Sequence, residues 1–374
     1  GEGAGASAFA DGLSKAVSGG RRAGRRLRGA SPAARLELPA SNRPAPPESA
    51  ALMPSLEPFL VERILMPKVW GGQALAQVMG IQLPAGEAIG ETWELYDRAE
   101  GSSRLRHSAR TLGQLMRECG DDLVGRGVPR AHGGRFPLLL KFLDARDGLS
   151  VQVHPDDAQA QRDRDSGKNE CCVILQAGPE ARIVRGLKPG VTREHFVANA
   201  ATEAVEDLLL AFRPMVGDTV HIPPGTVHAI GPDVVVFEVQ QNSDLTYRLY
   251  DWGRGRAVHV QKALSVLRPD AANDERPVVK PTQLPDGGTQ LIATQDFRVR
   301  RYSLRQPIQM ATDGRFATIT VISGKATLQW PGDRTIGTLP MAMGDTAVVP
   351  ACVAKYSLVP ADHVNFMICD PGIR

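Results

Sequence analysis

The sequence predicts a mainly β protein with two β-barrel domains and a small helical insert, and three observations support this fold class. Stretches such as residues 89–97 alternate between apolar and polar side chains, and short stretches of this kind resume after residue 290, as expected of strands with one buried face. A loop pattern of glycine, proline and histidine begins at Gly217. Its layout returns at Gly344, which indicates two copies of one structural unit.

Composition limits the classes of protein to which this chain can belong. Its 374 residues are enough for two domains, and 42% apolar with 23% charged residues is ordinary for a soluble globular protein. No apolar run reaches the roughly 18 residues that a membrane span needs, so we expect no membrane partner. Five cysteines without a C-x-x-C pair favour reduced thiols and a cytoplasmic location.

The net charge of +3 comes from the N-terminal tail. Residues 1–52 hold eight basic and four acidic side chains, so this tail carries +4 and the rest of the chain −1. A nucleic-acid partner is therefore not expected for the folded part. The tail is rich in Ala, Gly, Arg, Ser and Pro, which predicts disorder. It could be translated upstream sequence with Met53 as the natural start, an organelle-targeting segment or a nucleic-acid arm, and we favour the first.

The folded part begins at Met53 with predicted strands and one helix. Residues 57–65 are expected to form a strand, and residues 67–72, with a proline and two glycines, a turn. The first clear helix is predicted over residues 111–120, where leucine and methionine recur on one face. Further strands are predicted over residues 89–97, 137–143, 149–154 and 171–177.

Four side chains on or beside these strands are candidate metal ligands. Gln152 and His154 share one face of their strand, because strand side chains alternate with period two. By the same alternation, Lys168 and Glu170 share a face at the head of the next strand. Together with His228, the histidines and the carboxylate favour a metal site over isolated structural histidines. The candidate ligands are Gln152, His154, Glu170 and His228.

The loop before His228 has fixed positions with mechanical reasons. Gly217 opens a turn, Pro223 ends a short strand, and Gly225 supplies the backbone freedom that lets the chain reverse. This spacing resembles the second signature of the cupin superfamily. The resemblance implies a jelly-roll β-barrel in which this histidine binds a metal ion.

Four segments, in order along the chain, resemble the type I mannose-6-phosphate isomerase family. They are LSVQVHPDD from Leu149, GKNE from Gly167, GDTVHIPPGTVHAIG from Gly217 and EVQQNSDLTYRLYDWGR from Glu238. The resemblance covers most of residues 57–260 and indicates a short bacterial-type form. It implies a small sugar-phosphate substrate and one Zn²⁺ per chain. The residues that match the family's zinc ligands are Gln152, His154, Glu170 and His228.

The same resemblance implies catalytic and substrate-binding residues. Lys168, Glu238 and Arg248 match polar residues of the substrate pocket, and Asp244 lies in the same matched segment. Glu238, Lys168 and Asp244 are candidates for proton transfer and cannot be ranked from the sequence, whereas Arg248 could bind phosphate or stabilise an enediolate. If the segment were extended, even spacing would place Glu238 and Arg248 on one face, although Asn242-Ser243-Asp244 is a turn signal.

One departure from the family pattern follows the GKNE segment. The family usually has aromatic residues there, whereas this chain has Cys171-Cys172-Val173. Cys172 shares a face with Glu170 and could approach the metal, but we favour the role of a small buried hydrophobic residue.

The remaining chain is predicted to contain an insert and a second barrel. A helical insert is expected over residues 186–212, with Thr192 capping a helix and a second helical run at residues 204–210. Residues 53–269 would form the catalytic domain. Residues 270–374 would form a degenerate copy, in which Cys352 and Lys355 stand where Gly225 and His228 stand in the first.

Together with the candidate metal site, the resemblance implies a metal-dependent aldose–ketose isomerase that interconverts mannose 6-phosphate and fructose 6-phosphate through an enediol. Two alternatives are a cupin non-haem iron oxygenase, because two histidines and a carboxylate describe its facial triad, and a non-catalytic sugar-binding regulatory cupin. Gln152 as a fourth ligand and the cations Lys168 and Arg248 argue against the first. The intact ligand set with Glu238 and Arg248 argues against the second. We expect a monomer or weak dimer.

Overall fold

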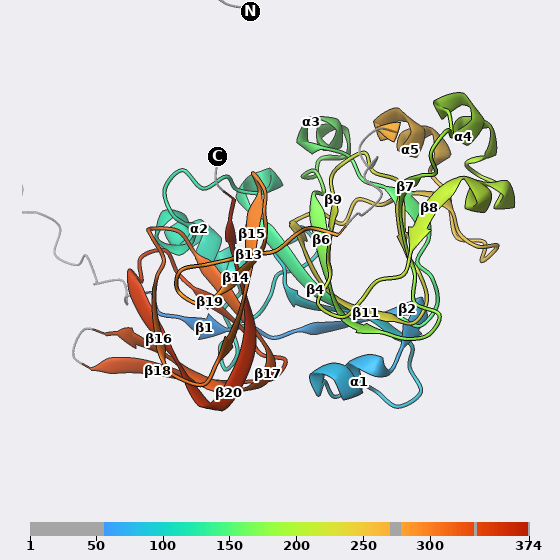
Figure 1. The fold of residues 1–374 in the computed structure, drawn as a ribbon. Helices are drawn as coiled ribbons and strands as arrows, with labels where there is room; N and C mark the ends of the chain where they lie inside the picture. The colour runs from blue at the N-terminus through green and yellow to red at the C-terminus, as the bar shows by residue number, and fades with distance from the viewer. Residues whose placement is uncertain (1–55, 270–277, 333–334, 373–374) are drawn as a thin grey trace, which may run out of the picture. The chain divides into compact units, whose positions relative to one another are not determined.

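The computed structural model describes residues 56–269, 278–332 and 335–372. Figure 1 shows two β-barrels, the first built mainly from strands between β2 and β12 and the second from β13 to β20. The predicted mainly β fold class is confirmed. The tail predicted over residues 1–52 lies outside the described residues. In the described part, no helix has the length and apolar character needed to cross a membrane.

The first barrel consists of two facing antiparallel sheets. The six-stranded sheet has the order β2 (Ile64–Gly72), β3 (Ile89–Leu95), β4 (Leu138–Ala145), β11 (Val234–Gln241), β6 (Glu170–Ala177) and β9 (Thr219–Ile222). The five-stranded sheet has the order β12 (Tyr247–Tyr250), β5 (Val151–Val153), β10 (His228–Ile230), β7 (Ile183–Leu187) and β8 (Leu209–Phe212).

Helices surround this barrel. Figure 1 shows α3, α4 and α5 at one end and α1 at the other. The predicted helix at residues 111–120 is longer than expected, because a capping box at Thr111 starts it and the helical run continues past a kink at Cys119. The helices are α1 (Ala74–Met79), α2 (Leu112–Val124), α3 (Asp157–Ala160), α4 (Arg193–Asn199) and α5 (Val260–Val266), and the 3₁₀ turns are η1 (His132–Gly134), η2 (Gln161–Asp163) and η3 (Glu203–Leu208).

The insert agrees with the prediction in its first helix and differs in its second. Thr192 caps α4 and accepts a hydrogen bond from the His195 backbone N–H at 3.1 Å, as predicted. The second helical run expected at residues 204–210 is confirmed in part. It is the 3₁₀ helix η3, which ends at Leu208 because Leu209 leaves it to pair with Leu187 in strand β7.

Two further predictions near the N-terminal end of the described chain are wrong. The single strand expected at residues 57–65 is divided into β1 (Phe59–Leu60) and the start of β2, and β1 pairs with β19 of the second barrel. The turn expected at residues 67–72 belongs to β2. Pro67 lacks an N–H for the strand ladder, and shifts of register on both sides of it let the strand continue.

The second barrel is one connected antiparallel sheet of nine strands. Two of its strands run for 15 and 17 residues, so the short strands expected after residue 290 are only partly confirmed. Its strands after β1 are β13 (Thr282–Gln283), β14 (Thr289–Ala293), β15 (Phe297–Leu304), β16 (Ile308–Ala311), β17 (Ala317–Pro331), β18 (Ile336–Ala342), β19 (Thr346–Val349) and β20 (Lys355–Pro371).

An apolar seam joins the two barrels. The outward side chains of the six-stranded sheet, among them Phe237 and Cys171, belong to the same buried cluster as Phe297, Phe316 and Cys369 of the second barrel. The inward side chains form a separate cluster that includes Cys172 and Ile174. Strands β4 and β11 are therefore buried on both faces, which fixes the strands that carry the site.

Candidate active site

Three of the four predicted ligands lie together inside the first barrel. His154 follows β5, His228 begins β10, and Glu170 begins β6 in the opposite sheet. One ligand atom from each side chain lies within 4.8 Å of the others, and all three side chains are almost fully buried. The sequence brings them together because β10 pairs with β5 in the five-stranded sheet and that sheet faces the strand of Glu170.

Gln152 lies directly beside this cluster. It is the strand partner of His228, and its Nε2 lies 3.2 Å from the imidazole Nε2. Ser150 Oγ donates to the amide oxygen of Gln152 at 3.3 Å. A half-turn of the amide would present its oxygen to the same point. All four predicted ligands are therefore adjacent.

Backbone carbonyls fix which nitrogen each histidine turns to the centre. His154 Nδ1 donates to the carbonyl oxygen of Leu245 at 2.8 Å, and His228 Nδ1 donates to that of Thr226 at 3.0 Å. In the neutral ring the other nitrogen, Nε2, is then a lone-pair donor to a metal. Both Nε2 atoms face Glu170 Oε1, at 3.4 Å and 3.1 Å.

The charge state of the cluster also suits a cation. Burial and the nearby Lys168 lower the pKa of His154 to about 3, so this imidazole is neutral. Burial opposes ionisation of Glu170, but Lys168 and His154 hold its pKa well below the usual range. The buried His154 Nε2 has no hydrogen-bond partner. Two imidazole lone pairs and a carboxylate that converge in a buried site fit a divalent ion such as Zn²⁺.

The loop before His228 reverses the chain at Gly225, as its spacing predicted. Gly225 has a φ of +87°, and its N–H donates to the carbonyl oxygen of His154 at 2.8 Å. A residue with a Cβ would be strained at this φ. The loop therefore connects two of the ligands through its own backbone.

A cavity of about 270 Å³ opens beside the ligands. Of the predicted ligands, Gln152 is among its lining residues, together with the predicted polar residues Lys168, Glu238, Asp244 and Arg248. Its lining includes Lys68, Trp70, Glu91, Lys141, Gln152, Lys168, Glu238, Asp244, Arg248 and Arg256.

Lys141 and Glu91 were not identified from the sequence. The Lys141 ammonium is buried, 3.5 Å from both Glu91 and Glu238 and 3.9 Å from Asp244. Burial disfavours ionisation of Glu91, but Lys141 and Lys68 outweigh it and lower the pKa of Glu91 to about 2. A lysine within the apolar strand LLLKFL was a signal that could have revealed Lys141, because a buried lysine needs partners.

Glu238 differs from the other carboxylates of the cavity. It lies on β11 opposite Cys172 and Lys141, and its Oε1 has no hydrogen-bond partner. Burial and the negative charge of Glu170 raise its pKa, despite Lys141 and Lys168. Lys168 lies 3.0 Å from Glu170 Oε2. Burial acts against its charge, but Glu170 and Glu238 raise the pKa of Lys168.

Arg248 reaches the cavity from the sheet opposite Glu238. Of the two arrangements that the sequence left open, the turn at Asn242-Ser243-Asp244 is the one observed, because β11 ends at Gln241 and β12 begins at Tyr247 in the opposite sheet. Its guanidinium donates to the carbonyl oxygen of Ala257 at 2.6 Å, and its Nε is buried without a partner. Asp244 lies in the turn between the two strands.

Cys172 and Lys355 do not join the metal-binding cluster. Cys172 packs in the apolar interior of the first barrel, and burial raises the pKa of its thiol, so it behaves as a small hydrophobic residue. Lys355 begins β20 and is exposed. Within the described ranges, His154, Glu170 and His228 form the grouping of side chains suited to a metal.

Comparison with known proteins places this site in a family. A family model described as "Phosphomannose isomerase type I, catalytic domain" matches residues 59–171. The mannose-6-phosphate isomerase of Streptococcus mutans is 30% identical over 83% of this chain and 99% of its own length. The mannose-6-phosphate isomerase ManA of Bacillus subtilis is 32% identical over 81% of this chain and 96% of its own length.

Solved structures agree with this placement. The crystal structure of the mannose 6-phosphate isomerase from Bacillus subtilis has a TM-score of 0.74 at 28% identity and covers 84% of this chain and 99% of its own. A mannose 6-phosphate isomerase solved with zinc and yttrium shares the fold, with a TM-score of 0.69 at 16% identity over 85% of this chain and its full length. The chain therefore belongs to the type I phosphomannose isomerase family.

Proposed function

We propose that this chain interconverts mannose 6-phosphate and fructose 6-phosphate in the cavity beside its metal-binding cluster. One Zn²⁺ per chain would be held by Gln152, His154, Glu170 and His228. The observation that carries the proposal is the buried group of two imidazoles and a carboxylate, next to a cavity with paired acidic and basic side chains. The zinc in the solved relative supports the identity of the metal.

We assign the proton transfers to two different residues of the cavity. The chemistry that a bound divalent ion supplies is polarisation of the sugar carbonyl and stabilisation of an enediolate. Glu238 is the proposed base that moves a proton between C1 and C2, because its raised pKa and its place on the cavity wall suit a group that gains and loses a proton. Lys168, held protonated by its neighbours, is the proposed acid at the sugar oxygens.

The cations at the wall suit an anionic substrate. Lys68 and Arg256 line the same cavity as Arg248, and their charges would attract a phosphate group. We assign Arg248 to the developing enediolate, because its guanidinium is held in place by the Ala257 carbonyl and a preorganised donor is most effective where charge develops. Asp244, with its side chain about half exposed, is the least suited of the three proton-transfer candidates.

The two other classes of function fit less well. A non-haem iron oxygenase leaves positions of its metal open for oxygen, whereas Gln152 stands at this metal site as a fourth ligand. A purely sugar-binding protein has no need of a buried carboxylate with a raised pKa. We further propose that residues 53–269 form the catalytic domain and residues 270–374 the degenerate one. A cytoplasmic location and a monomer or weak dimer remain predictions.

Metal analysis with a coupled isomerase assay tests the proposal. Purified protein should contain about one zinc per chain and convert mannose 6-phosphate, and a His228→Ala, Glu170→Ala double variant should lose both. Lys355→Ala is the matched control, because Lys355 holds the corresponding position in the second barrel, and it should keep metal and turnover. Stoichiometric metal in the folded double variant would contradict the ligand assignment.

A further inference from the structure

Asn169 links the metal-binding strand to the second barrel. It lies between Lys168 and Glu170, and its side chain is buried. Glu170 turns into the barrel, whereas Asn169 contacts a residue of the second barrel: its Nδ2 donates to Asp296 Oδ2 at 2.8 Å. Asp296 lies between β14 and β15. The contact joins residues that are 127 positions apart.

The carboxylate of Asp296 decides the orientation of the Asn169 amide. An ionised carboxylate only accepts hydrogen bonds, so the amide must present its nitrogen to Asp296 and its oxygen to the other side. On that side His221 Nε2 lies 2.8 Å from Asn169 Oδ1 and must donate. The Asn169 backbone N–H donates to Gln241 Oε1 at 2.9 Å. Hydrogen bonds with Asp296, His221 and Gln241 thus hold Asn169 in place.

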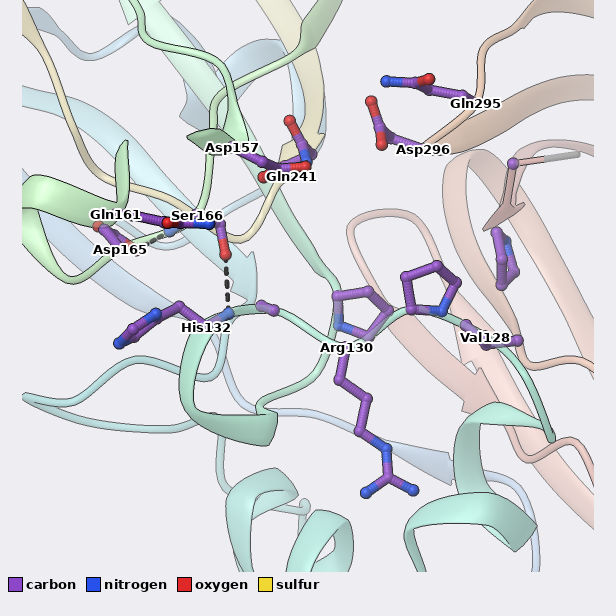
Figure 2. Close-up of a pocket in the computed structure, with 15 residues that line it drawn as sticks. Val128, Arg130, His132, Asp157, Gln161, Asp165, Ser166, Gln241, Gln295 and Asp296 are labelled. Atoms are coloured by element: carbon purple, nitrogen blue, oxygen red, sulfur yellow. Dashed lines mark hydrogen bonds between the residues drawn. The ribbon is translucent and has the colours of Figure 1, made fainter. Parts of the chain in front are cut away.

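The surroundings of Asp296 make this contact accessible to experiment. Asp296 lines a seam pocket of about 210 Å³, and Figure 2 shows it beside Gln295, facing Gln241 and Asp157 of the first barrel. Asp296 is only partly buried, so its replacement removes a contact without opening a cavity in the apolar core.

We propose that Asp296, a residue of the second barrel, is a positioning residue for the metal centre. It orients Asn169 and thereby fixes the adjacent Lys168 and Glu170. This inference rests on the proposed metal site. It also gives the second barrel, which lacks a ligand cluster of its own in the described residues, an indirect part in the reaction of the first.

The expected size of the effect follows from other metal sites. Partners that orient a ligand through hydrogen bonds typically change metal affinity by about 10- to 100-fold. Asp296 acts through one further residue, so the lower end applies. We expect Asp296→Ala to weaken zinc binding about tenfold and to lower kcat more than it changes KM, because Lys168 and Glu170 lose their common support.

The experiment compares metal retention in matched variants. Zinc affinity is measured by competition with a chelator in the full-length wild-type protein and in Asp296→Ala, Asp296→Asn and Gln295→Ala. Asp296→Asn keeps an oxygen that accepts from Asn169 and should retain near-wild-type affinity. Gln295→Ala changes the neighbouring residue of the same pocket and should have no effect. Equal affinities in Asp296→Ala and Gln295→Ala would overturn the inference.

A second pair of variants tests the direction of the hydrogen bonds. Asn169→Asp places two carboxylates against each other and should lose affinity. Adding Asp296→Asn places an amide donor opposite the new carboxylate and should recover zinc affinity. If the contact only stabilised the seam, the variants would change the melting temperature, but the second substitution would not recover zinc affinity. If the double variant binds zinc no better than Asn169→Asp, the inference is wrong. Wild-type protein that binds no zinc would instead refute the proposed function itself.

Discussion

Arg248 has a guanidinium whose position is fixed before any substrate arrives. Its side chain donates to the Ala257 carbonyl, and its backbone N–H and C=O both meet His259. Burial and the nearby Arg256 lower the pKa of Arg248. A guanidinium that is partly shielded from water can stabilise an anion that forms during the reaction.

We expect Arg248→Ala to lower kcat and kcat/KM together by about 10²-fold, the usual loss for a preorganised donor that acts in the transition state. Steady-state kinetics with mannose 6-phosphate measures it. Arg305→Ala is the control, because Arg305 pairs with Asp362 at the surface and such a pair contributes less than about 1 kcal/mol. A raised KM with unchanged kcat would assign Arg248 to the phosphate, and near-wild-type kinetics would remove it from the mechanism.

The lowered pKa of His221 predicts how the free energy of unfolding changes with pH. Burial and Arg185 lower its pKa from 6.5 to about 4, against the opposing charge of Glu170. Between these two values the unfolded chain binds a proton that the folded chain does not, so the free energy of unfolding falls as the pH decreases from about 6.5 to 4. The contribution is complete above pH 6.5.

His221→Gln should therefore flatten this part of the stability curve by about 1.4 kcal/mol per pH unit, the value of one proton. Urea unfolding at several pH values between 4 and 7 measures the slope. His195→Gln, which alters an exposed residue of α4, should leave the slope unchanged. An identical slope in the wild type and the His221 variant would show that this imidazole titrates normally in the fold.

Alternation along strands contributed to the choice of candidate ligands, because Gln152 and His154 keep period-two spacing, as do Lys168 and Glu170. Lys141 and Glu91 could not be found in this way. Their role depends on which strands pair: β4 stands between β3 and β11, and this order places Lys141 next to Glu91 and Glu238. Sheet order is a long-range property that local patterns do not contain.

At the scale of elements, the loop between β9 and β10 depends on Gly225. A Cβ at this position would lie 2.7 Å from the side chain of Arg268, in addition to the cost of a positive φ. Gly190 has a φ of +82°, but a Cβ added there would meet no other atom within 4 Å. Substitution of Gly190 therefore introduces backbone strain alone, whereas substitution of Gly225 introduces both strain and crowding.

Gly190→Ala should cost about 1–2 kcal/mol of stability, the usual cost of a left-handed conformation, and leave zinc content unchanged. Gly225→Ala should cost more and should also reduce zinc content, because its N–H bonds the carbonyl of His154 and its loop ends at His228. Thermal unfolding and metal analysis of both variants measure the difference. Equal behaviour of the two variants would contradict a specific role for the loop.

Elements were predictable where local signals were complete. Thr111 with Gln114 and Thr192 with His195 mark helix starts that the structure reproduces. The strand through Pro67 was not predictable, because a bulge in the pairing with β3 compensates for the missing N–H. The early end of the 3₁₀ helix before Leu209 was missed for a similar reason: pairing with β7 overrides a local helical pattern.

At the scale of the whole molecule, an apolar seam joins the two barrels. Phe136, just before β4, and Phe316, just before β17, are both buried, and their ring centroids are 4.5 Å apart. Both belong to one apolar cluster that spans the two barrels. Neither barrel can lose its partner without exposing this surface, so the two should unfold together.

Phe316→Ala should therefore cost about 3–5 kcal/mol, the usual loss for a buried aromatic residue, and should lower the stability of both barrels in one transition. Ile336→Ala, at a side chain that is 67% exposed, serves as the control and should be almost neutral. Tryptophan fluorescence and zinc release are followed during the same urea titration, because Trp70, Trp93 and Trp252 report on the first barrel and Trp330 on the second. Coincident curves that shift together are expected. Early release of zinc while part of the fluorescence change is still to come would mean that the first barrel unfolds separately, and that the seam does not couple the metal centre to the second barrel.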